Sequence, residues 1–269
     1  DIVLAEPVPW AQNRPRIIYS SAAGVYNLYS GNPNTYQARQ RFSSTVNAPL
    51  EVGDAVLALA LEDNTTDSSP YGNTMTANNS PGTVAAVFGN GYSSTKSAYL
   101  STTGHAEMNI GTGPFYVSVW FKSEDATNRG ANKYLWALTD NGAGPSMYAY
   151  LFVETDGSLA FHISDDASTV DDIDASGDVF DAMWHNVIVV RDENALLYTM
   201  YIDGINAGTA AISAAAASMA TDEFYVADHY NGSTNFYWEG LIDDVSFGIG
   251  AVVSAEAVAK IHAEGRKKL

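Results

Sequence analysis

The sequence predicts an all-β protein: a two-sheet antiparallel sandwich with an extended N-terminal arm over residues 1–50 and a short C-terminal helix. Three observations carry this prediction. A strong hairpin signal lies in residues 182–207, short apolar stretches recur about every ten residues from Ala55 onward, and only the end of the chain carries helix signals. Regular short strands separated by turn residues are typical of β-sandwiches.

The hairpin signal consists of two apolar, β-branched runs, Asn186 to Val190 and Leu197 to Ile202, on either side of a polar connection. Asp203 and Gly204 follow at once, and this pair supplies the positive φ angles that a tight turn needs. A third strand is therefore expected from Ile205 onward.

Further strands are expected on both sides of this hairpin. The first is the continuous apolar run at residues 55–61, and the run from Phe115 to Lys122 alternates between two faces. Residues 165–181 are rich in Asp and Ser, which predicts an acidic loop. The remaining expected strands are Val84 to Phe88, Ala98 to Ser101, Tyr134 to Leu138, Tyr148 to Val153, Leu159 to Ile163, Phe224 to Ala227, and a final strand pair between Trp238 and Phe247.

A helix is expected only after Ser254, which is a good N-cap. Glu256 lies in the first turn, where the helix dipole favours an acidic residue, and Val258 and Ile261 share one face. Because no other helix is expected, Rossmann, P-loop and TIM-barrel folds are excluded together.

Residues 1–50 differ from the rest of the chain. Pro7, Pro9 and Pro15 interrupt any long element, and a series of aromatic residues offers anchors for packing. This composition predicts an arm that packs on other subunits of an assembly or on the chain's own sandwich.

The net charge of −18 is unevenly distributed over the 269 residues, because residues 1–41 carry four arginines against Asp1 and Glu6. An acidic surface repels nucleic acid and anionic membranes and is suited to holding cations, although it can serve solubility alone. No apolar run approaches the length of a membrane span. The chain has no cysteine, which excludes disulfides and a thiolate nucleophile.

Four segments resemble the laminin-G-like, concanavalin A-like jelly-roll family in their order along the chain. They cover about residues 55–265 and are LEDNTTDSSPYGN, FYVSVWFKSE, the pair WHNVIVV and YTMYIDG, and EGLIDDVSFG followed by the helical AVVSAEAVAKIHAEG. The resemblance implies a jelly-roll domain over residues 51–269, often with a structural calcium ion, used as a sugar- or protein-binding module in extracellular and viral proteins. The arm falls outside it.

The predicted cofactor is a structural calcium ion, which prefers six to eight oxygen ligands. Asp63, Asp67 and Asn73 lie in one loop rich in oxygen ligands. If the first and last strands pair, as the resemblance implies, Asp243 or Asp244 arrives beside that loop. Strict alternation in the last strand places these two aspartates on opposite faces, so one of them is expected to coordinate. The alternative is that the loop aspartates only stabilise turns and that Asp244 is solvated.

Catalysis is not expected. Retaining glycoside hydrolysis needs two carboxylates about 5 Å apart, and Glu154-Thr155-Asp156 is the best match to the Glu-x-Asp-x-x-Glu motif of related jelly rolls. The match fails because Leu159 and Ala160 stand where the second glutamate should follow, and Asp156-Gly157 is better explained as a turn.

The sequence predicts a sugar-binding loop between residues 228 and 238. Tyrosine and tryptophan rings there can stack on a sugar, with Asp228 and the asparagines as hydrogen-bonding partners. The alternative is that Trp238 packs inward and Tyr230 is merely exposed. The full candidate set is Asp228, Tyr230, Asn231, Asn235, Tyr237 and Trp238.

The predicted function is therefore a non-catalytic, lectin-like module displayed on a larger assembly, such as a phage or viral decoration, fibre or tail protein. Its expected partners are a carbohydrate or cell-surface glycan and, through residues 1–50, other subunits. The expected location is extracellular or on a virion surface. The alternatives are a secreted carbohydrate-binding module of a polysaccharide-degrading system and, less favoured, a glycoside hydrolase.

Overall fold

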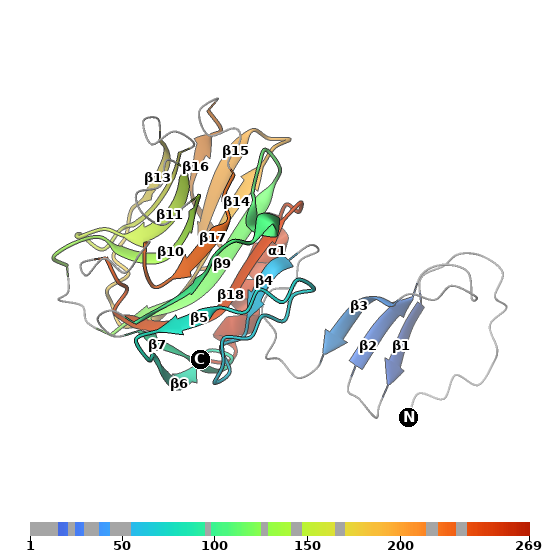
Figure 1. Ribbon diagram of the computed structural model, residues 1–269. Coiled ribbons are helices and arrows are strands. Elements are labelled where there is room, and N and C mark those ends of the chain that lie inside the picture. The colour runs from blue at the N-terminus through green and yellow to red at the C-terminus, as the bar shows by residue number, and fades with distance from the viewer. Residues whose placement is uncertain are drawn as a thin grey trace, which may run out of the picture. The chain divides into compact units, whose positions relative to one another are not determined.

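The computed structural model divides the chain into two compact units, Asp1–Val46 and Asn47–Leu269 (Figure 1). The structure describes residues 16–20, 25–29, 38–43, 55–94, 98–124, 129–140, 147–164, 170–213, 220–229 and 236–269.

The first unit contains a three-stranded antiparallel sheet in the order β1-β2-β3. Its strands are β1 (Arg16–Ser20), β2 (Val25–Tyr29) and β3 (Ala38–Ser43). The sequence predicted an extended arm, whereas these strands form two consecutive hairpins.

The second unit is a sandwich of two antiparallel sheets. The seven-stranded sheet has the order β13 (Asp171–Ala175), β12 (Leu159–Ser164), β11 (Tyr148–Val153), β10 (Lys133–Thr139), β17 (Glu223–Val226), β8 (Tyr99–Thr102) and β5 (Thr76–Asn78). The eight-stranded sheet has the order β16 (Ile205–Ala211), β15 (Leu197–Ile202), β14 (Trp184–Asp192), β9 (Phe115–Ser123), β18 (Gly240–Ile249), β7 (Gly89–Ser94) and β6 (Gly82–Ala86), and β4 (Ala55–Leu59) also pairs with β18. A short 3-10 helix, η1 (Ala106–Met108), follows β8.

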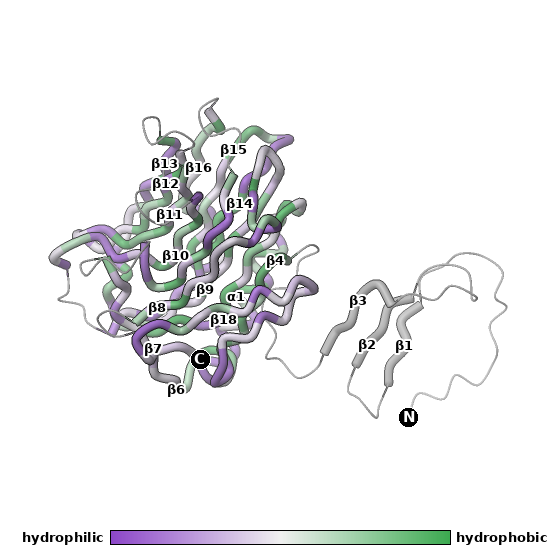
Figure 2. Tube along the Cα trace, in the orientation of Figure 1, coloured by the Kyte–Doolittle hydropathy of each residue, from purple (hydrophilic) through white to green (hydrophobic). Residues whose placement is uncertain are grey.

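The main hydrophobic core lies between these two sheets. The alternation expected in the strand at residue 115 is confirmed, because Phe115, Val117, Val119 and Phe121 are fully buried in this core. Apolar residues recur along the strands of both sheets (Figure 2). The all-β, two-sheet jelly-roll architecture predicted from the sequence is thus confirmed.

Helix α1 (Ala255–Arg266) covers part of the outer face of the eight-stranded sheet. The hydroxyl of Ser254 accepts a hydrogen bond from the backbone N–H of Ala257 at 3.2 Å, which confirms the expected N-cap. Val258 is fully buried against Tyr116 and Ile188 of the sheet. The outer face of the seven-stranded sheet is therefore on the side of the sandwich opposite to α1.

Three details differ from the expected strands. The run near residue 84 is a hairpin of β6 and β7 that turns at Val87 and Phe88, and the expected final strand pair is the single strand β18. The acidic segment expected to be a loop contains β13, because Ile173 and Ala175 are buried while Asp172 and Asp174 are exposed. The alternation of buried and exposed side chains at every second residue, rather than the acidic composition, indicates that this segment is a strand.

Candidate functional site

The outer face of the seven-stranded sheet carries a cluster of aromatic side chains, called here the aromatic face. It is separate from the core between the sheets. Tyr150, Phe152 and Tyr225 are largely buried, whereas Tyr99, Tyr134 and Tyr148 are half-buried and border the solvent. The aromatic face is defined by these six residues: Tyr99, Tyr134, Tyr148, Tyr150, Phe152 and Tyr225.

The rings of the aromatic face hold one another in place. Tyr148 and Tyr150 stack with their ring centroids 4.4 Å apart and their planes 7° from parallel. Tyr134 packs edge-on against Tyr150 at 5.3 Å and lies 5.1 Å from Phe152. Because each ring is fixed by its neighbours, little conformational freedom remains to be lost when a ligand stacks on them.

Hydrogen-bonding groups surround these rings. On the side toward β13, His162 and Asp174 lie 3.9 Å apart and both are accessible to solvent. On the other side, the carboxylate of Glu223 accepts hydrogen bonds from the hydroxyls of Thr139 and Tyr225, each at 3.1 Å. An apolar ring surface bordered by carboxylate and imidazole groups can bind a molecule with one apolar face and several hydroxyls.

His229 joins this cluster from the connection after β17. Its ring centroid lies 4.7 Å from that of Tyr134 and 5.2 Å from that of Tyr150. Burial lowers the pKa of His229 to about 4, so its ring is neutral at physiological pH. The site therefore carries no cationic imidazole at this position.

The described residues of the predicted sugar-binding loop are buried. Trp238 is fully buried, stacks on Phe180 at 6.1 Å and therefore offers no ring face to a sugar. Tyr237 is 4% exposed, and Asp228 is fully buried and accepts a hydrogen bond from the backbone N–H of His229. These positions correct the expectation that Tyr237 and Trp238 form a stacking platform. Tyr230, Asn231 and Asn235 lie outside the described residues.

The charge of the buried Asp228 affects the pKa of two neighbouring tyrosines, of which Tyr99 belongs to the aromatic face. Burial raises the pKa of the Tyr99 and Tyr237 phenols, and the negative charge of Asp228 raises both further. A phenol is already protonated at neutral pH, and the raised pKa keeps both hydroxyls as hydrogen-bond donors in more alkaline solution as well.

The sequence does contain the signal for the aromatic face. Tyr148, Tyr150 and Phe152 occupy alternate positions of one strand, with Ala149 and Leu151 between them. Period-two spacing places the three aromatic rings on one face and the aliphatic residues on the other. What a single strand does not reveal is that β10 and β17 add Tyr134 and Tyr225 to the same face.

Two of the expected metal ligands instead fasten the loop that follows β4. The carboxylate of Asp67 accepts hydrogen bonds from the backbone N–H groups of Ala58 at 2.8 Å, Ser69 at 2.8 Å and Asn73 at 2.6 Å, and from the Ser69 hydroxyl at 2.6 Å. Asn73 donates to the backbone carbonyl of Val56 at 2.8 Å. These contacts occupy both carboxylate oxygens of Asp67, so that side chain does not fit a calcium site, whereas the contact of Asn73 uses its amide nitrogen.

Asp63 is exposed, and its carboxylate accepts a hydrogen bond from the side chain of Asn90 at 2.9 Å. Its φ of 60° lies in the left-handed region, which aspartate tolerates better than most residues. Asp63 is thus exposed, whereas Asp67 is buried.

The predicted pairing of the first and last strands is confirmed by β4 and β18. The strict alternation expected in β18 is wrong, because the register with β9 shifts between Asp243 and Ser246 and Asp244 adopts a φ of 48°. Because of this irregularity, the side chain of Val245 lies in the core between the sheets. The side chain of Asp243 lies outside that core and accepts a hydrogen bond from Phe88, so the two residues do not share a face.

Asp243 is fully buried beside Glu62. One carboxylate oxygen of Asp243 accepts from the backbone N–H of Phe88 at 2.8 Å, and the other has no hydrogen-bond partner among the described residues. Burial, with a smaller contribution from the charge of Glu62, raises the pKa of Asp243 to about 7, although hydrogen bonds from backbone N–H groups oppose the rise. Burial and the charge of Asp243 together raise the pKa of Asp244 well above its ordinary value.

Glu62 has the same incomplete hydrogen bonding. Its Oε2 accepts from the backbone N–H of Asn90 at 3.0 Å, whereas Oε1 is buried without a partner in the described part of the chain. Two unpaired buried carboxylate oxygens fit the oxygen preference of calcium. Backbone carbonyls would have to complete such a site, since the described residues contain no group of three or more His, Asp or Glu side chains arranged to hold a metal.

The carboxylates tested for glycoside hydrolysis lie in a tight turn between β11 and β12. Asp156 accepts from the backbone N–H and the hydroxyl of Ser158, and Gly157 adopts a φ of 97°. These contacts confirm the interpretation of Asp156-Gly157 as a turn.

The two antiparallel sheets define the class of this protein as a jelly-roll sandwich. The sequence matches the profile of the concanavalin A-like lectin/glucanases superfamily over residues 93–258, and the chain belongs to this superfamily. Comparison with curated proteins returns no match.

Solved structures share the fold at low sequence identity. The binding domain of Paraclostridial Mosquitocidal Protein 1 aligns with a TM-score of 0.63 at 13% identity over 78% of this chain and 52% of its own. The binding domain of botulinum neurotoxin DC, solved with rat synaptotagmin II, aligns with a TM-score of 0.63 at 14% identity over 79% of this chain and 52% of its own. This chain thus spans about half of these toxin domains.

A third match covers a whole domain. Domain 4 of AbnA, an extracellular arabinanase from Geobacillus stearothermophilus solved with arabinotriose, aligns with a TM-score of 0.59 at 15% identity over 78% of this chain and 100% of its own. No helix among the described residues is long and apolar enough to cross a membrane.

Proposed function

We propose that this chain is a non-catalytic carbohydrate-binding module that holds a glycan on its aromatic face. The observation that carries the proposal is the stacked pair of Tyr148 and Tyr150, in which the half-buried Tyr148 borders the solvent and Tyr150 supports it from a cluster separate from the main core. Domain 4 of the arabinanase, a similar jelly roll, was solved with arabinotriose, which supports a saccharide ligand.

The chemistry of this face suits a sugar. The C–H face of a pyranose or furanose packs on an aromatic ring, while its hydroxyls need donors and acceptors at the ring's edge. His162, Asp174 and Glu223 supply these groups. The net charge of −18 disfavours strongly anionic glycans, so neutral saccharides are the expected ligands.

A glycan array on the full chain tests this proposal. We expect binding to a defined set of neutral glycans, and Tyr148→Ala should weaken it about tenfold, equivalent to ~1.4 kcal/mol at 25 °C. Tyr71→Ala is the matched control, because Tyr71 is 53% exposed and lies outside the aromatic face. Equal binding by both variants, or no binding by the folded wild-type chain, would contradict the proposal.

A protein receptor is the second candidate ligand. The binding domain of botulinum neurotoxin DC was solved with rat synaptotagmin II, a protein, and it shares this fold. This alternative would be favoured if the wild type bound no glycan on the array and captured a protein that Tyr148→Ala does not capture.

We also propose that Glu62 and Asp243 hold a structural calcium ion together with backbone carbonyls. Bound calcium would neutralise the buried carboxylate of Asp243 and the half-buried carboxylate of Glu62, and so stabilise the attachment of the β4 and β7 segments to β18. Calcium should raise the melting temperature of the wild type, and EDTA should reverse the rise.

Asp243→Asn should abolish this response, whereas Asp63→Asn should keep it, because the Asp63 carboxylate is bonded to Asn90. Loss of the response in Asp63→Asn would restore Asp63 to the ligand set. Identical melting of the wild type in calcium and EDTA would exclude a structural calcium ion.

The wider setting remains part of the proposal: an extracellular or virion-surface module that residues 1–50 join to other subunits, for example in a phage or viral assembly. The excess of arginine over acid in residues 1–41 supports electrostatic contact with an acidic partner. Sedimentation of the full chain and of residues 47–269 tests it. Equal oligomeric states would contradict a role of the arm in self-assembly.

A further inference from the structure

The stacked pair of Tyr148 and Tyr150 indicates from which side a sugar reaches the aromatic face. Tyr150 lies two residues after Tyr148 on β11, and the two rings are nearly parallel with their centroids 4.4 Å apart. Tyr150 therefore covers the side of the Tyr148 ring that points along the strand. A sugar ring that packs on Tyr148 approaches from the other side, over the end of the sheet where β11 begins.

The strand register shows which side chains border that position. Tyr148 is paired with Ser164 on one side and with Thr139 on the other, and Thr139 is paired in turn with Glu223 of β17. Ser164 and Thr139 are fully buried, so the half-buried Tyr148 and Glu223 are the two members of this row that border the solvent. Neighbouring strands lie ~4.8 Å apart, which places the backbone of Glu223 roughly 10 Å from that of Tyr148.

The carboxylate of Glu223 is held in one orientation. The hydroxyls of Thr139 and Tyr225 both donate to its Oε2 atom, each at 3.1 Å. Its Oε1 atom accepts no hydrogen bond within the described part of the chain. A carboxylate that is oriented before binding, with one oxygen still able to accept, forms strong charge-assisted hydrogen bonds with hydroxyls at a low entropic cost.

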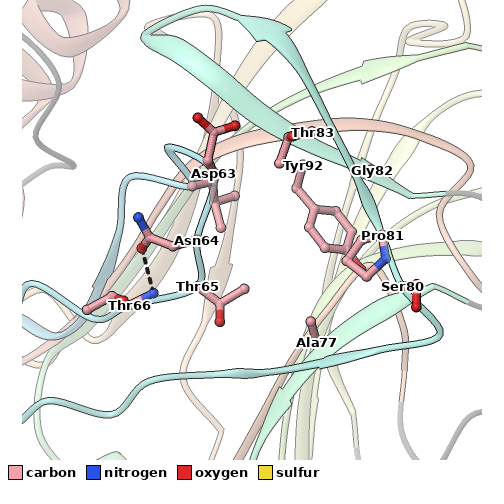
Figure 3. Close-up of a pocket in the computed structure, with 11 residues that line it drawn as sticks. Asp63, Asn64, Thr65, Thr66, Ala77, Ser80, Pro81, Gly82, Thr83 and Tyr92 are labelled. Carbon is pink, nitrogen blue, oxygen red and sulfur yellow. Dashed lines mark hydrogen bonds between the residues drawn. The ribbon is translucent and has the colours of Figure 1, made fainter.

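The pocket beside β5 and β6 does not offer a comparable surface. It has a volume of about 470 Å³, and Tyr92 is the one aromatic side chain among the described residues that line it (Figure 3). Tyr92 is 3% exposed, so its ring is not accessible to a sugar. The combination of an accessible ring and an oriented carboxylate is therefore a property of the row that contains Tyr148 and Glu223.

We propose that Glu223 determines which sugars the aromatic face accepts. Its carboxylate receives hydrogen bonds from the hydroxyls of a neutral sugar packed on Tyr148, and it repels a sugar that carries a carboxylate of its own. This inference rests on the proposed function and deepens it by assigning the selectivity of that site to one residue.

The physical reason for the selectivity is the chemistry of a carboxylate. An ionised carboxylate accepts hydrogen bonds and donates none, so the sugar must supply free hydroxyls on the side that faces β17. A uronic acid brings a second negative charge close to Glu223, and like charges in contact disfavour binding. Glu223 thus contributes an attractive contact to neutral sugars and a repulsive one to acidic sugars.

Saturation-transfer NMR titrations on the full chain test the proposal. The probes are the methyl glycosides of glucose, galactose and mannose, each compared with the methyl glycoside of its own uronic acid. The wild type should bind at least one neutral glycoside about tenfold more tightly than the matching uronide. Glu223→Gln should weaken binding of that neutral glycoside about fivefold and should reduce the preference over the uronide to about twofold.

Two further variants separate charge from orientation. Tyr225→Phe removes one of the hydroxyls that orient the carboxylate, so it should weaken binding of the neutral glycoside about threefold but keep the preference over the uronide. Glu256→Gln is the matched control, because it removes the same charge from an exposed position on α1 and should change neither quantity. Melting temperatures of all variants show whether each is folded.

An unchanged preference in a folded Glu223→Gln variant would overturn the proposal. Loss of the preference in Asp174→Asn but not in Glu223→Gln would also overturn it, because the sugar would then lie on the side of the aromatic face next to β13. In both cases weaker binding by Tyr148→Ala would leave the proposed function intact. A wild-type chain that binds none of the neutral glycosides and no glycan on the array would instead contradict the proposed function itself.

Discussion

The Nδ1 atom of His185 lies 2.8 Å from the Oδ2 atom of Asp203, and this contact joins the beginning of β14 to the turn between β15 and β16. Asp181 approaches the other ring nitrogen at 3.1 Å. His185 is thus held between two carboxylates at the corner that the sequence identified as a tight Asp-Gly turn.

The pH dependence of stability should reveal this contact. Burial alone lowers the pKa of His185, but the two carboxylates outweigh burial and raise the pKa above 6.5. A raised folded pKa contributes stability that is complete below the unfolded value and is lost as the pH rises through the folded value.

The excess stability of wild type over His185→Gln should therefore be larger at about pH 5.5 than at about pH 8.5. Thermal melts of both proteins across this range measure the difference, and the subtraction removes contributions from the other histidines. A difference that grows with pH would contradict this assignment.

Asp67→Ala should destabilise the chain by about 3 kcal/mol, because four hydrogen bonds to a largely buried carboxylate are lost. Asp67→Asn keeps one acceptor oxygen, so its free energy of unfolding should lie between those of the wild type and Asp67→Ala. Urea unfolding in EDTA and in calcium measures both variants. If Asp67→Ala lost a calcium response and nothing else, Asp67 would be a metal ligand after all.

Trp238→Ala should destabilise the fold by about 3–5 kcal/mol, since the ring is fully buried and packs on Phe180 and Phe121. The fraction that remains folded should bind glycans with unchanged affinity. Tyr148→Ala should show the reverse pattern, a small change in stability and a large loss of binding. Parallel unfolding and binding measurements distinguish the two residues.

Gly265→Ala should destabilise the chain by about 1–3 kcal/mol, although alanine is normally the better residue in a helix. The reason is steric: a Cβ atom at this position overlaps the indole of Trp120. Ser254→Ala removes the N-cap and should cost about 1 kcal/mol. Calorimetry of both variants measures these two losses of stability. A Gly265→Ala protein more stable than the wild type would contradict the close packing of α1 on the sheet.

The elements that the sequence predicts best are those with local signals. The turn at Asp203 and Gly204 has both φ angles positive, at 52° and 80°, as the Asp-Gly pair requires. The hairpin of β6 and β7 was missed because its strands are rich in glycine and small residues, which carry no alternation of large apolar side chains. The irregularity at Asp244 depends on the neighbouring strand and has no local signature.

The candidate site was harder to predict than the fold. Asp67 has the right chemistry for calcium, but its carboxylate oxygens accept equally well from backbone N–H groups, so composition alone does not separate the two roles. Glu62 follows the first strand directly, and its importance emerges only when β4 and β18 bring it beside Asp243. Burial likewise depends on the whole fold, which is why Trp238 was misjudged as a ligand-binding residue.

The position of α1 on the outer face of the eight-stranded sheet makes oriented attachment of the protein practical. Lys260 is exposed on this helix, and the chain has no cysteine of its own. A Lys260→Cys variant therefore carries one unique thiol for coupling to a sensor chip or array slide. Molecules tethered in this way turn the aromatic face toward the liquid, so a weak glycan signal cannot be attributed to random orientation on the support.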